Sequence, residues 1–411
     1  MTIHLTREWS RSTDAEAIVV GGGPAGSAFA TQLADAGHRV VLLDKARFPR
    51  HKACSEYINP AATRLLADLD VLDDVMGAGA DRMEAMVVHS PNGGRFVADY
   101  ARAEPGQAAL GLSRYRLDHI LLERAKAAGV RVVERAHVRS LILEKGRPVG
   151  VEATINGTRE TIRAPLIAGA DGHHSVVSRD LELDAPVRWP CKTGLIAHYR
   201  GVSGLERFGE MHVGQGAYGG LAILEDGLTN VAVVVNDRDV EARSGSIDDF
   251  FEESFRSIPD MARKLEGAVR VGGIRGVGSM AHRARRTAGD GFLLIGDAAS
   301  FLDPFTGEGI YEALKGAALA APVASAALQA GDTSAAALDR YRLARRRTFT
   351  AKRQVCWIVQ GFIGSPPLMN YVTDRLARRE DLGLTLSGVL GNFRPATEAL
   401  SPAFLVKLLR P

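Results

Sequence analysis

Short apolar runs that end at glycine or at a charged residue divide the start of the chain into alternating strands and a helix. Residues 17–20 are four apolar residues followed directly by glycines. Residues 24–36 form a helical segment that Gly37 ends, and after Arg39 residues 40–43 form a second apolar run. Continuous apolar runs of this length are typical of strands buried on both faces. The pattern predicts a β-α-β unit of an α/β fold.

The turn between the first run and the helix carries a nucleotide-binding pattern. Gly21, Gly23 and Gly26 match G-x-G-x-x-G between a strand and a helix. The first glycine permits a tight turn, the second allows a pyrophosphate to approach, and the third lets the helix pack closely. Asp44 ends the second strand 18 residues after Gly26, near the spacing of about 20 for a ribose-binding acid. The unit therefore predicts dinucleotide binding.

Two later segments narrow the choice of dinucleotide. An acid at the position of Asp44 suits NAD or the adenosine half of FAD better than NADP. One later apolar strand enters an Asp-Gly turn at Asp171, and another ends at Asp297. Gly307 and Gly309 then precede a long alanine-rich helix.

At these residues the chain resembles the para-hydroxybenzoate hydroxylase-like flavoproteins, a superfamily that also contains geranylgeranyl reductases and flavin-dependent halogenases. The resemblance covers about residues 17–328 in the right order. It implies an α/β fold with a Rossmann-like FAD-binding domain of the glutathione reductase type. An inserted mixed β-sheet would form the substrate domain, followed by C-terminal helices. FAD is the implied cofactor, with NADPH or NADH as transient electron donor.

The resemblance also implies how FAD is held. Asp297 matches an aspartate on the ribityl chain, and Asp171 would lie between the flavin and the passing nicotinamide. Arg114 matches an arginine at the phosphates, and the backbone of Val138 would contact adenine. The backbone N–H groups after Gly307 would favour negative charge on the reduced flavin. The expected cofactor contacts are Gly21, Gly23, Ala25, Gly26, Asp44, Lys45, Arg114, Val138, Asp171, Asp297, Gly307 and Gly309.

The order of these segments makes the FAD-binding domain discontinuous. Strand-rich insertions separate its pieces and would cover the flavin, and Asn156-Gly157 and Asp226-Gly227 are predicted hairpin turns. From residue 332 the chain is predicted to be helical, with breaks at residues 364–367 and 401–402. We expect an FAD-binding domain of residues 1–80, 102–183 and 268–345, a substrate-binding domain of residues 81–101 and 184–267, and a C-terminal helical segment of residues 346–411.

The composition of the chain limits the kinds of binding partner that we expect. The chain of 411 residues is 46% hydrophobic, and its 51 Lys+Arg against 48 Asp+Glu leave a net charge of +3. That balance excludes a nucleic-acid-binding surface. Three cysteines without paired spacing indicate a reducing, cytoplasmic location and no metal site. Residues 1–14 are polar and expected to be frayed, and no apolar run is long enough for a signal peptide or a transmembrane span.

Two C-terminal features bear on membranes. We interpret the basic residues of one helix as a solvated face, with phosphate or an anionic membrane as the alternative partner. The apolar tail is expected to pack on the core, with peripheral membrane docking as its alternative. The basic residues are Arg340, Arg342, Arg345, Arg346, Arg347, Lys352 and Arg353.

Three flavin chemistries remain. Halogenases of the superfamily carry Trp-x-Trp-x-Ile-Pro, and here no two tryptophans are two residues apart, which all but excludes that branch. Geranylgeranyl reductases carry Tyr-x-Trp-x-Phe-Pro, whose counterpart at residues 218–223 lacks the tryptophan, phenylalanine and proline. Residues 48–60 nevertheless resemble the reductases' Pro-Arg-x-Lys-x-Cys-Gly stretch, with Ser55 in place of glycine.

We therefore expect an FAD-dependent monooxygenase that hydroxylates a lipophilic phenolic or polyketide-like molecule with NAD(P)H and oxygen. The first alternative is a reductase that saturates C=C bonds of a prenyl or isoprenoid-quinone substrate, in which Cys54 could donate a proton. The second is a membrane-docked flavoprotein that carries electrons. A separate flavin reductase is a further expected partner. Phenol hydroxylation needs a nearby base, and the candidate catalytic residues are Cys54, Glu56, His212 and Tyr218, with His51 and Tyr57 beside them.

Overall fold

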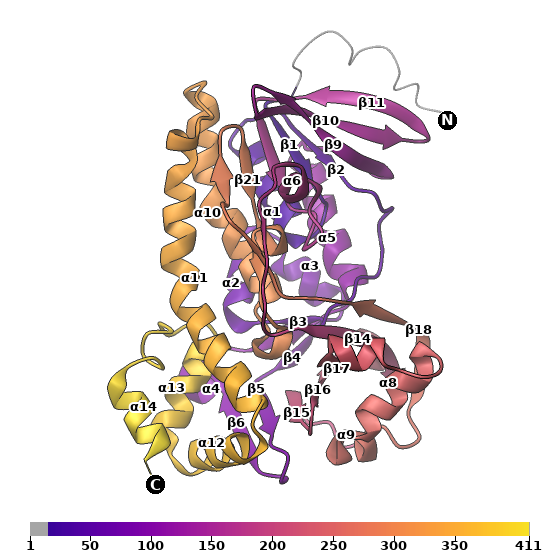
Figure 1. The fold of residues 1–411 in the computed structure, drawn as a ribbon, viewed down its shortest axis with the longest axis vertical. Helices are drawn as coiled ribbons and strands as arrows, with labels where there is room; N and C mark the ends of the chain where they lie inside the picture. The colour runs from indigo at the N-terminus through magenta and orange to yellow at the C-terminus, as the bar shows by residue number, and fades with distance from the viewer. Residues whose placement is uncertain (1–14, 411) are drawn as a thin grey trace.

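The computed structural model describes residues 15–410 (Figure 1). The expected frayed segment 1–14 lies outside the described residues. The glycine motif belongs to a six-stranded sheet, here called the parallel sheet, in which only the edge strand β20 is antiparallel. Its strands, in pairing order, are β20 (Ala288–Gly289), β21 (Phe292–Leu294), β12 (Leu166–Gly169), β1 (Ala17–Val20), β2 (Val40–Leu43) and β8 (Arg131–Val133).

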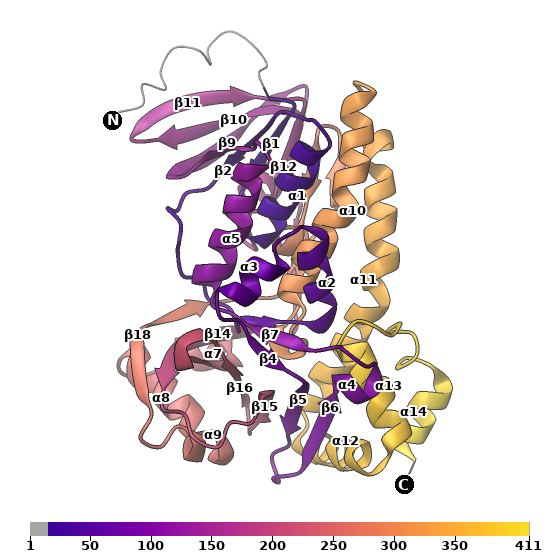
Figure 2. The same ribbon diagram turned by 180° about the vertical axis from the view of Figure 1, so that it is seen from behind.

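Both faces of the parallel sheet are covered, as its apolar runs predict. Alternate side chains such as Val19 and Leu42 pack against a helical layer, which Figure 2 shows from behind. Their neighbours Ile18 and Val41 pack against a three-stranded antiparallel sheet. The helices are α1 (Pro24–Asp35), α5 (Arg114–Ala127) and α10 (Gly309–Gln329), and the strands are β9 (Ala136–Glu144), β10 (Arg147–Ile155) and β11 (Thr158–Arg163).

The inserted segments form a seven-stranded mixed sheet, which confirms the expected substrate-domain architecture. Neighbouring strands are antiparallel except for the β15–β5 pair, which is parallel. In pairing order the mixed sheet contains β18 (Val269–Val277), β14 (Lys192–Arg200), β17 (Thr229–Asn236), β16 (Ala217–Ile223), β15 (Phe208–Val213), β5 (Ala85–His89) and β6 (Arg95–Asp99).

Helices pack on both sides of the mixed sheet. One face, including Leu195 and Val233, buries Phe251 and Met261 of the helical pair α8 (Ile247–Arg256) and α9 (Pro259–Lys264). The opposite face joins a second apolar cluster that contains the C-terminal helices. Those helices are α11 (Ala335–Ile363), α12 (Pro366–Arg378), α13 (Glu380–Leu390) and α14 (Pro402–Leu409).

The helix α11 links the two sheets, because it packs beside α10 and β20 at one end and meets α12 at the other (Figure 1). The apolar tail packs on the core as expected, since Met369, Leu382 and Phe404 share a buried cluster with Phe96 of β6. The breaks near residues 364 and 401 are confirmed. A third break, at Arg379, was not predicted because it contains neither glycine nor proline.

The two predicted hairpin turns are confirmed: Asn156-Gly157 joins β10 to β11, and Asp226-Gly227 lies between β16 and β17. Strand β18 lies within a piece we expected in the FAD-binding domain, but it pairs with β14 of the mixed sheet. None of the helices within residues 15–410 combines the length and apolar character needed to cross a bilayer. The remaining elements are β3 (Tyr57–Ile58), α2 (Pro60–Asp68), α3 (Leu72–Gly77), β4 (Asp81–Met83), α4 (Tyr100–Ala103), β7 (Ala109–Gly111), α6 (Val176–Asp180), β13 (Asp184–Ala185), η1 (Glu225–Gly227), α7 (Asp237–Glu241), β19 (His282–Ala284), η2 (Gly296–Ala298), β22 (Ser300–Phe301) and η3 (Pro304–Thr306).

Candidate functional site

A cleft of about 420 Å³ lies where the carboxyl ends of β1, β2 and β12 meet strands β14 and β17 of the mixed sheet. Ligands bind at this edge of open α/β sheets because the loops that leave parallel strands converge there. All but one of the expected cofactor contacts line this cleft, although they span most of the chain. The lining contacts are Gly21, Gly23, Ala25, Asp44, Lys45, Arg114, Val138, Asp171, Asp297, Gly307 and Gly309.

The exception, Gly26, lies behind the turn and not in the cleft. A Cβ atom at Gly26 would lie 1.8 Å from the carbonyl oxygen of Gly21, so only glycine lets α1 pack this closely. Gly21 itself has φ +103°, and a Cβ there would lie 2.5 Å from the Ala170 oxygen. The two glycines thus bring the N-terminus of α1 to the cleft wall, where its N–H groups and dipole favour an anion.

Asp44 clamps the glycine turn. Its Oδ2 accepts a hydrogen bond from the Gly22 N–H at 2.7 Å, and its Oδ1 accepts one from the Ala46 N–H at 2.7 Å. A carboxylate oxygen can accept more than one hydrogen bond. Asp44 can therefore hold the turn and still accept a ribose hydroxyl from the cleft.

A cluster of cations faces the glycine turn. Arg114 Nε and Nη2 donate to the two oxygens of Asp118 at 2.5 and 2.8 Å, and Arg50 Nη1 donates to the same carboxylate at 2.7 Å. Asp118 is fully buried. The Nη2 atoms of Arg114 and Arg50 lie within 4 Å of where a Gly23 Cβ would be, so both guanidinium groups reach the phosphate position.

Lys52 adds a third cation to the cleft. Burial, together with Arg114 and Arg50, lowers the pKa of the Lys52 ammonium. An anion bound among three like charges relieves their mutual repulsion. The sequence reasoning missed Arg50, Lys52 and Asp118, although the first two lie in the segment that resembles the reductases and Asp118 lies one helical turn after Arg114.

Two half-buried carboxyl groups, Asp171 and Asp297, line the cleft. Asp171 Oδ2 accepts from the Val176 N–H at 2.8 Å, while Oδ1 has no hydrogen-bond partner among residues 15–410. Burial raises the pKa of Asp171 to about 6. Burial also raises the pKa of Asp297, against the opposing effect of Lys52 and Arg114. Such groups are suited to accept hydrogen bonds from ligand hydroxyl or N–H donors.

The start of α10 closes the cleft beside the mixed sheet. Gly307 has φ +67°, and a Cβ there would lie 2.7 Å from the Tyr57 ring, so backbone occupies the space next to the aromatic wall. Beyond it the cleft is apolar. Its walls here include Leu195, Ile196, Ala232, Val233, Val234, Val277, Met280 and Phe301.

Of the four candidate catalytic residues, Cys54 is the one that lines the cleft. Its sulfur accepts a hydrogen bond from the Glu56 N–H at 3.3 Å. Burial raises the pKa of the thiol, so Cys54 stays protonated at neutral pH. The candidate base His51 also lines the cleft, and burial and Arg275 lower its pKa.

The structure corrects the expectation for Glu56. Its carboxylate is fully buried and accepts from the Arg114 N–H at 2.8 Å and from Asn230 Nδ2 at 2.8 Å. The same carboxylate lies 2.6 Å from His198 Nε2. Glu56 joins the cofactor segments to the mixed sheet and does not line the cleft. A single sequence shows that Glu56 is near Cys54 but not which way its side chain points.

Tyr218 and His212 are corrected in the same way, because neither lines the cleft. The Tyr218 hydroxyl donates to Asp303 Oδ1 at 2.6 Å, and Lys192 Nζ lies over the tyrosine ring, 4.8 Å from its centroid. His212 is fully buried and its Nε2 lies 2.8 Å from Glu210 Oε2. Glu210 and His212 are two positions apart on β15, so their side chains share one face of the strand, whereas Asp303 is distant from Tyr218 in sequence.

Only some of the basic side chains of α11, between residues 340 and 353, are exposed to solvent. Arg345 and Lys352 are buried, which corrects their interpretation as part of a solvated face. Arg345 Nη2 donates to Ser300 Oγ at 3.0 Å, and Lys352 Nζ forms an ion pair with Glu308 at 2.9 Å. The exposed members are Arg340, Arg346 and Arg347.

Comparisons with known proteins agree with this geometry. The FAD binding domain family matches residues 14–356. The chain therefore belongs to this family, among the para-hydroxybenzoate hydroxylase-like flavoproteins, and is an FAD-dependent oxidoreductase.

Three similar proteins illustrate the range of the family. Digeranylgeranylglycerophospholipid reductase 2 of Methanopyrus kandleri is 31% identical over 80% of this chain and 81% of its own length. Digeranylgeranylglycerophospholipid reductase 1 of the same organism is 32% identical over 83% of this chain and 89% of its own length. The flavin-dependent brominase Bmp2 shares the fold, with a TM-score of 0.80, 21% identity and coverage of 92% of this chain and 93% of its own.

The residues of the cleft fit FAD. A glycine turn and three cations suit a diphosphate, and buried carboxyl groups with acceptor capacity suit hydroxyl-bearing sugar and ribityl groups. Gly307 and Gly309 line the cleft with backbone alone, which allows a flat ring to approach the start of α10. Each of these features faces the same cleft.

Proposed function

We propose that the protein is an FAD-dependent reductase that saturates carbon–carbon double bonds of a prenyl lipid. This was the first alternative to hydroxylation. The observation that favours it is similarity to two digeranylgeranylglycerophospholipid reductases, at 31% and 32% identity over at least 80% of this chain and of each relative. Hydroxylation of a phenol needs a base. Of the candidate bases, Glu56 and Tyr218 are hydrogen-bonded to other buried side chains, and His51 lines the cleft.

The walls of the cleft support a lipophilic substrate. The part bounded by β14, β17 and Met280 is lined by apolar residues, and the side chains of Ile196, Ala232 and Val234 lie on the face of the sheet opposite to α8 and α9. An isoprenoid chain has no polar group to satisfy there, and burying it removes apolar surface from water. Specificity for the chain would come from the shape of this apolar part of the cleft.

We propose that the cleft residues hold FAD as the family resemblance implies. Arg114 and the turn at Gly21 and Gly23 would bind the diphosphate, and Asp44 would bind the adenosine ribose. Asp297 would accept from the ribityl hydroxyls, and the Val138 backbone would contact adenine. Reduced FAD supplies the two electrons of the reaction, delivered with one hydrogen to one alkene carbon, after reduction by NADPH, NADH or a separate flavin reductase.

The second hydrogen arrives as a proton at the other alkene carbon. We propose Cys54 as its donor, because its sulfur lines the cleft and its raised pKa keeps it protonated. The Glu56 N–H donates to that sulfur, which orients the thiol and stabilises the thiolate left after transfer. A proton from solvent then restores the thiol.

The test uses the purified FAD-loaded protein, reduced with dithionite under anaerobic conditions so that no particular electron donor is required. Digeranylgeranylglycerophospholipid and an alkylated phenol are supplied in parallel, and the masses of the products are measured by mass spectrometry. We expect the prenyl lipid to gain two hydrogen atoms per reduced double bond. Gain of an oxygen atom by the phenol in aerobic reactions with NAD(P)H, without reduction of the lipid, would replace this proposal by hydroxylation.

Cys54→Ala tests the proton donor, with Cys191→Ala as the matched control because Cys191 is exposed and lies outside the cleft. Loss of a general acid typically costs about 100-fold or more in rate. We expect that loss in Cys54→Ala, with the FAD content unchanged, and none in Cys191→Ala. Equal rates in the two variants would show that the proton comes from elsewhere.

A further inference from the structure

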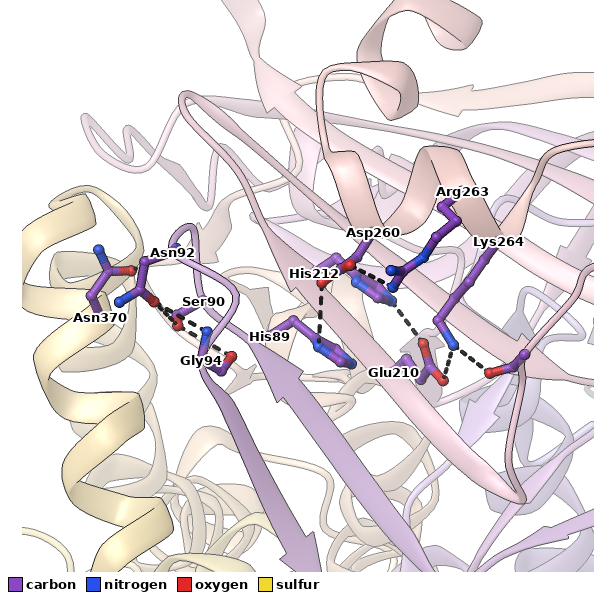
Figure 3. Close-up of polar contacts among 11 residues, drawn as sticks. His89, Ser90, Asn92, Gly94, Glu210, His212, Asp260, Arg263, Lys264 and Asn370 are labelled. Carbon is purple, nitrogen blue, oxygen red and sulfur yellow. Dashed lines mark hydrogen bonds and ion pairs between the residues drawn. The ribbon is translucent and has the colours of Figure 1, made fainter.

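Two histidines are brought together at the parallel pair of strands in the mixed sheet. The register of β5 and β15 sets His89 beside His212. Their rings stack with centroids 4.4 Å apart and planes only 2° apart. Asp260 of α9 reaches the same point, with its Oδ2 3.8 Å from His89 Nδ1 (Figure 3). The three potential ligand atoms lie within 4.8 Å of one another.

His212 has an unused nitrogen. Its side chain is fully buried, and Nδ1 has no hydrogen-bond partner in the part of the chain that the structure describes. Polar atoms buried in this way are uncommon and call for a partner. The sequence offers no such ligand spacing, because the three residues are far apart along the chain, and we expected no metal site from it.

The other nitrogen of His212 is already oriented. Its Nε2 lies 2.8 Å from Glu210 Oε2, and Lys264 Nζ donates to Glu210 Oε1 at 3.0 Å. A proton shared between Nε2 and this carboxylate leaves the lone pair on Nδ1. A histidine whose second nitrogen donates to a carboxylate is the usual arrangement around protein-bound zinc.

The remaining two groups are available as ligands. His89 Nδ1 lies 3.8 Å from Asp260 Oδ2, beyond hydrogen-bonding distance, so that nitrogen is not committed to this carboxylate. Asp260 uses Oδ1 to accept from Arg263 Nη2 at 2.7 Å, which leaves Oδ2 toward His89. Both side chains are partly exposed, so an ion can reach them from solvent.

We propose that His89, His212 through Nδ1, and Asp260 bind a divalent transition metal ion of the zinc type. Two imidazoles and a carboxylate are ligands that zinc accepts, and a water molecule would complete a tetrahedron. Ligand atoms in such a site lie about 3.3 Å apart, given metal–nitrogen distances of about 2.0–2.1 Å. The rings must therefore turn out of their stack, and the ligand atoms, which lie within 4.8 Å of one another, must move closer together. The bound ion would tie α9 to β5 and β15.

The experiment uses the full-length, FAD-loaded protein after chelator treatment. Zn²⁺ binding is measured by isothermal titration calorimetry and by the change in melting temperature, and Co²⁺ binding by its visible absorption. We expect one equivalent of Zn²⁺ at micromolar or tighter affinity, a higher melting temperature, and the intense absorption of tetrahedral Co²⁺. Because no readout depends on turnover, the result is independent of the proposed reductase activity.

His89→Gln and Asp260→Asn are expected to weaken Zn²⁺ binding at least tenfold and to abolish the Co²⁺ spectrum. Glu210→Gln, which alters the partner of His212, should weaken binding by about tenfold. His119→Gln is the matched control, because His119 also pairs with a carboxylate, Glu123, at 3.7 Å on a helix surface. Absence of binding, or binding that is equally tight in His89→Gln and Asp260→Asn, would overturn the proposal.

Discussion

Buried polar groups have different hydrogen-bond partners in two regions of the molecule. One region is the loops at the end of the parallel sheet, and the other is the mixed sheet and its margin. In the cleft, Asp171 Oδ1 has no hydrogen-bond partner among residues 15–410, and Gly23 and Gly309 line the walls with backbone alone. In and beside the mixed sheet, Glu56 pairs with His198 and Asn230, and Tyr218 pairs with Asp303.

This difference separates groups with unused hydrogen-bonding capacity, which a ligand could satisfy, from groups that are hydrogen-bonded within the protein and stabilise its framework. A buried polar atom without a partner costs free energy unless something else satisfies it. The unpartnered Asp171 oxygen faces the cleft, where a ligand can reach it, whereas Glu56 and Tyr218, two of the candidates suggested by the sequence, are hydrogen-bonded within the framework. His212 is the one candidate that combines both properties, because one nitrogen is paired and the other is not.

The largest expected effect comes from disturbing the glycine turn. Gly26→Val places side-chain atoms against the Gly21 carbonyl, where even a Cβ would lie at 1.8 Å. Since backbone cannot yield as a flexible side chain can, we expect a loss of at least about 3 kcal/mol of stability and no bound flavin. Thermal unfolding measures the loss of stability, and flavin absorbance measures the bound flavin. Gly273→Ala, whose added Cβ meets nothing within 4 Å, should bind FAD normally, and a yellow Gly26→Val protein would contradict the role of the turn.

Asp118→Asn tests whether the cation cluster depends on its buried carboxylate. Arg114 and Arg50 would lose their shared counter-ion, and breaking a buried pair typically costs about 3–5 kcal/mol. We expect a lower melting temperature and weaker FAD binding, measured by calorimetry. Asp339→Asn, which breaks the exposed pair with Arg342, should change neither. If the two variants behave alike, the cluster is not what organises the phosphate position.

Replacing Asp171 by asparagine is expected to stabilise the apoprotein by an amount that depends on pH. Burial raises its pKa from 3.8 to about 6, so ionisation destabilises the folded apoprotein by about 3 kcal/mol at pH 8 and by about half of that at pH 5. The penalty is absent below the unfolded pKa and complete above the folded pKa. Asp171→Asn should therefore stabilise the apoprotein more at pH 8 than at pH 5 in denaturant unfolding, while weakening FAD binding. An equal gain at both pH values would show that ionisation of Asp171 is not the cause.

The smallest expected effect comes from the framework of the mixed sheet. Tyr218→Phe removes a hydrogen bond to Asp303, and a buried bond to a charged group is worth about 2 kcal/mol. We expect that loss of stability with normal flavin content and a reduction rate within about twofold of the unchanged protein. Tyr115→Phe, at an exposed position, controls for loss of a tyrosine hydroxyl. A large loss of turnover in Tyr218→Phe would return this residue to the candidate catalytic group.

Local sequence was sufficient for the first β-α-β unit of the parallel sheet, and the family resemblance added most of the other residues of the cleft. The glycines report backbone conformations that other residues rarely adopt, as Gly21 with φ +103° shows. Asp44, Asp171 and Asp297 follow apolar runs that become parallel strands or their extensions. Because such strand ends meet at one edge of a sheet, their convergence could be predicted without knowing any long-range contact.

Partners across the mixed sheet could not be predicted in this way. The pairing of Glu56 with His198 and the meeting of His89 with Asp260 join segments distant in sequence. His198 and His89 lie on strands of the mixed sheet, and a shift of one residue in strand register would turn their side chains to the opposite face. Register depends on how the whole sheet packs against its helices, so no local pattern encodes which buried groups become framework and which are left for a ligand.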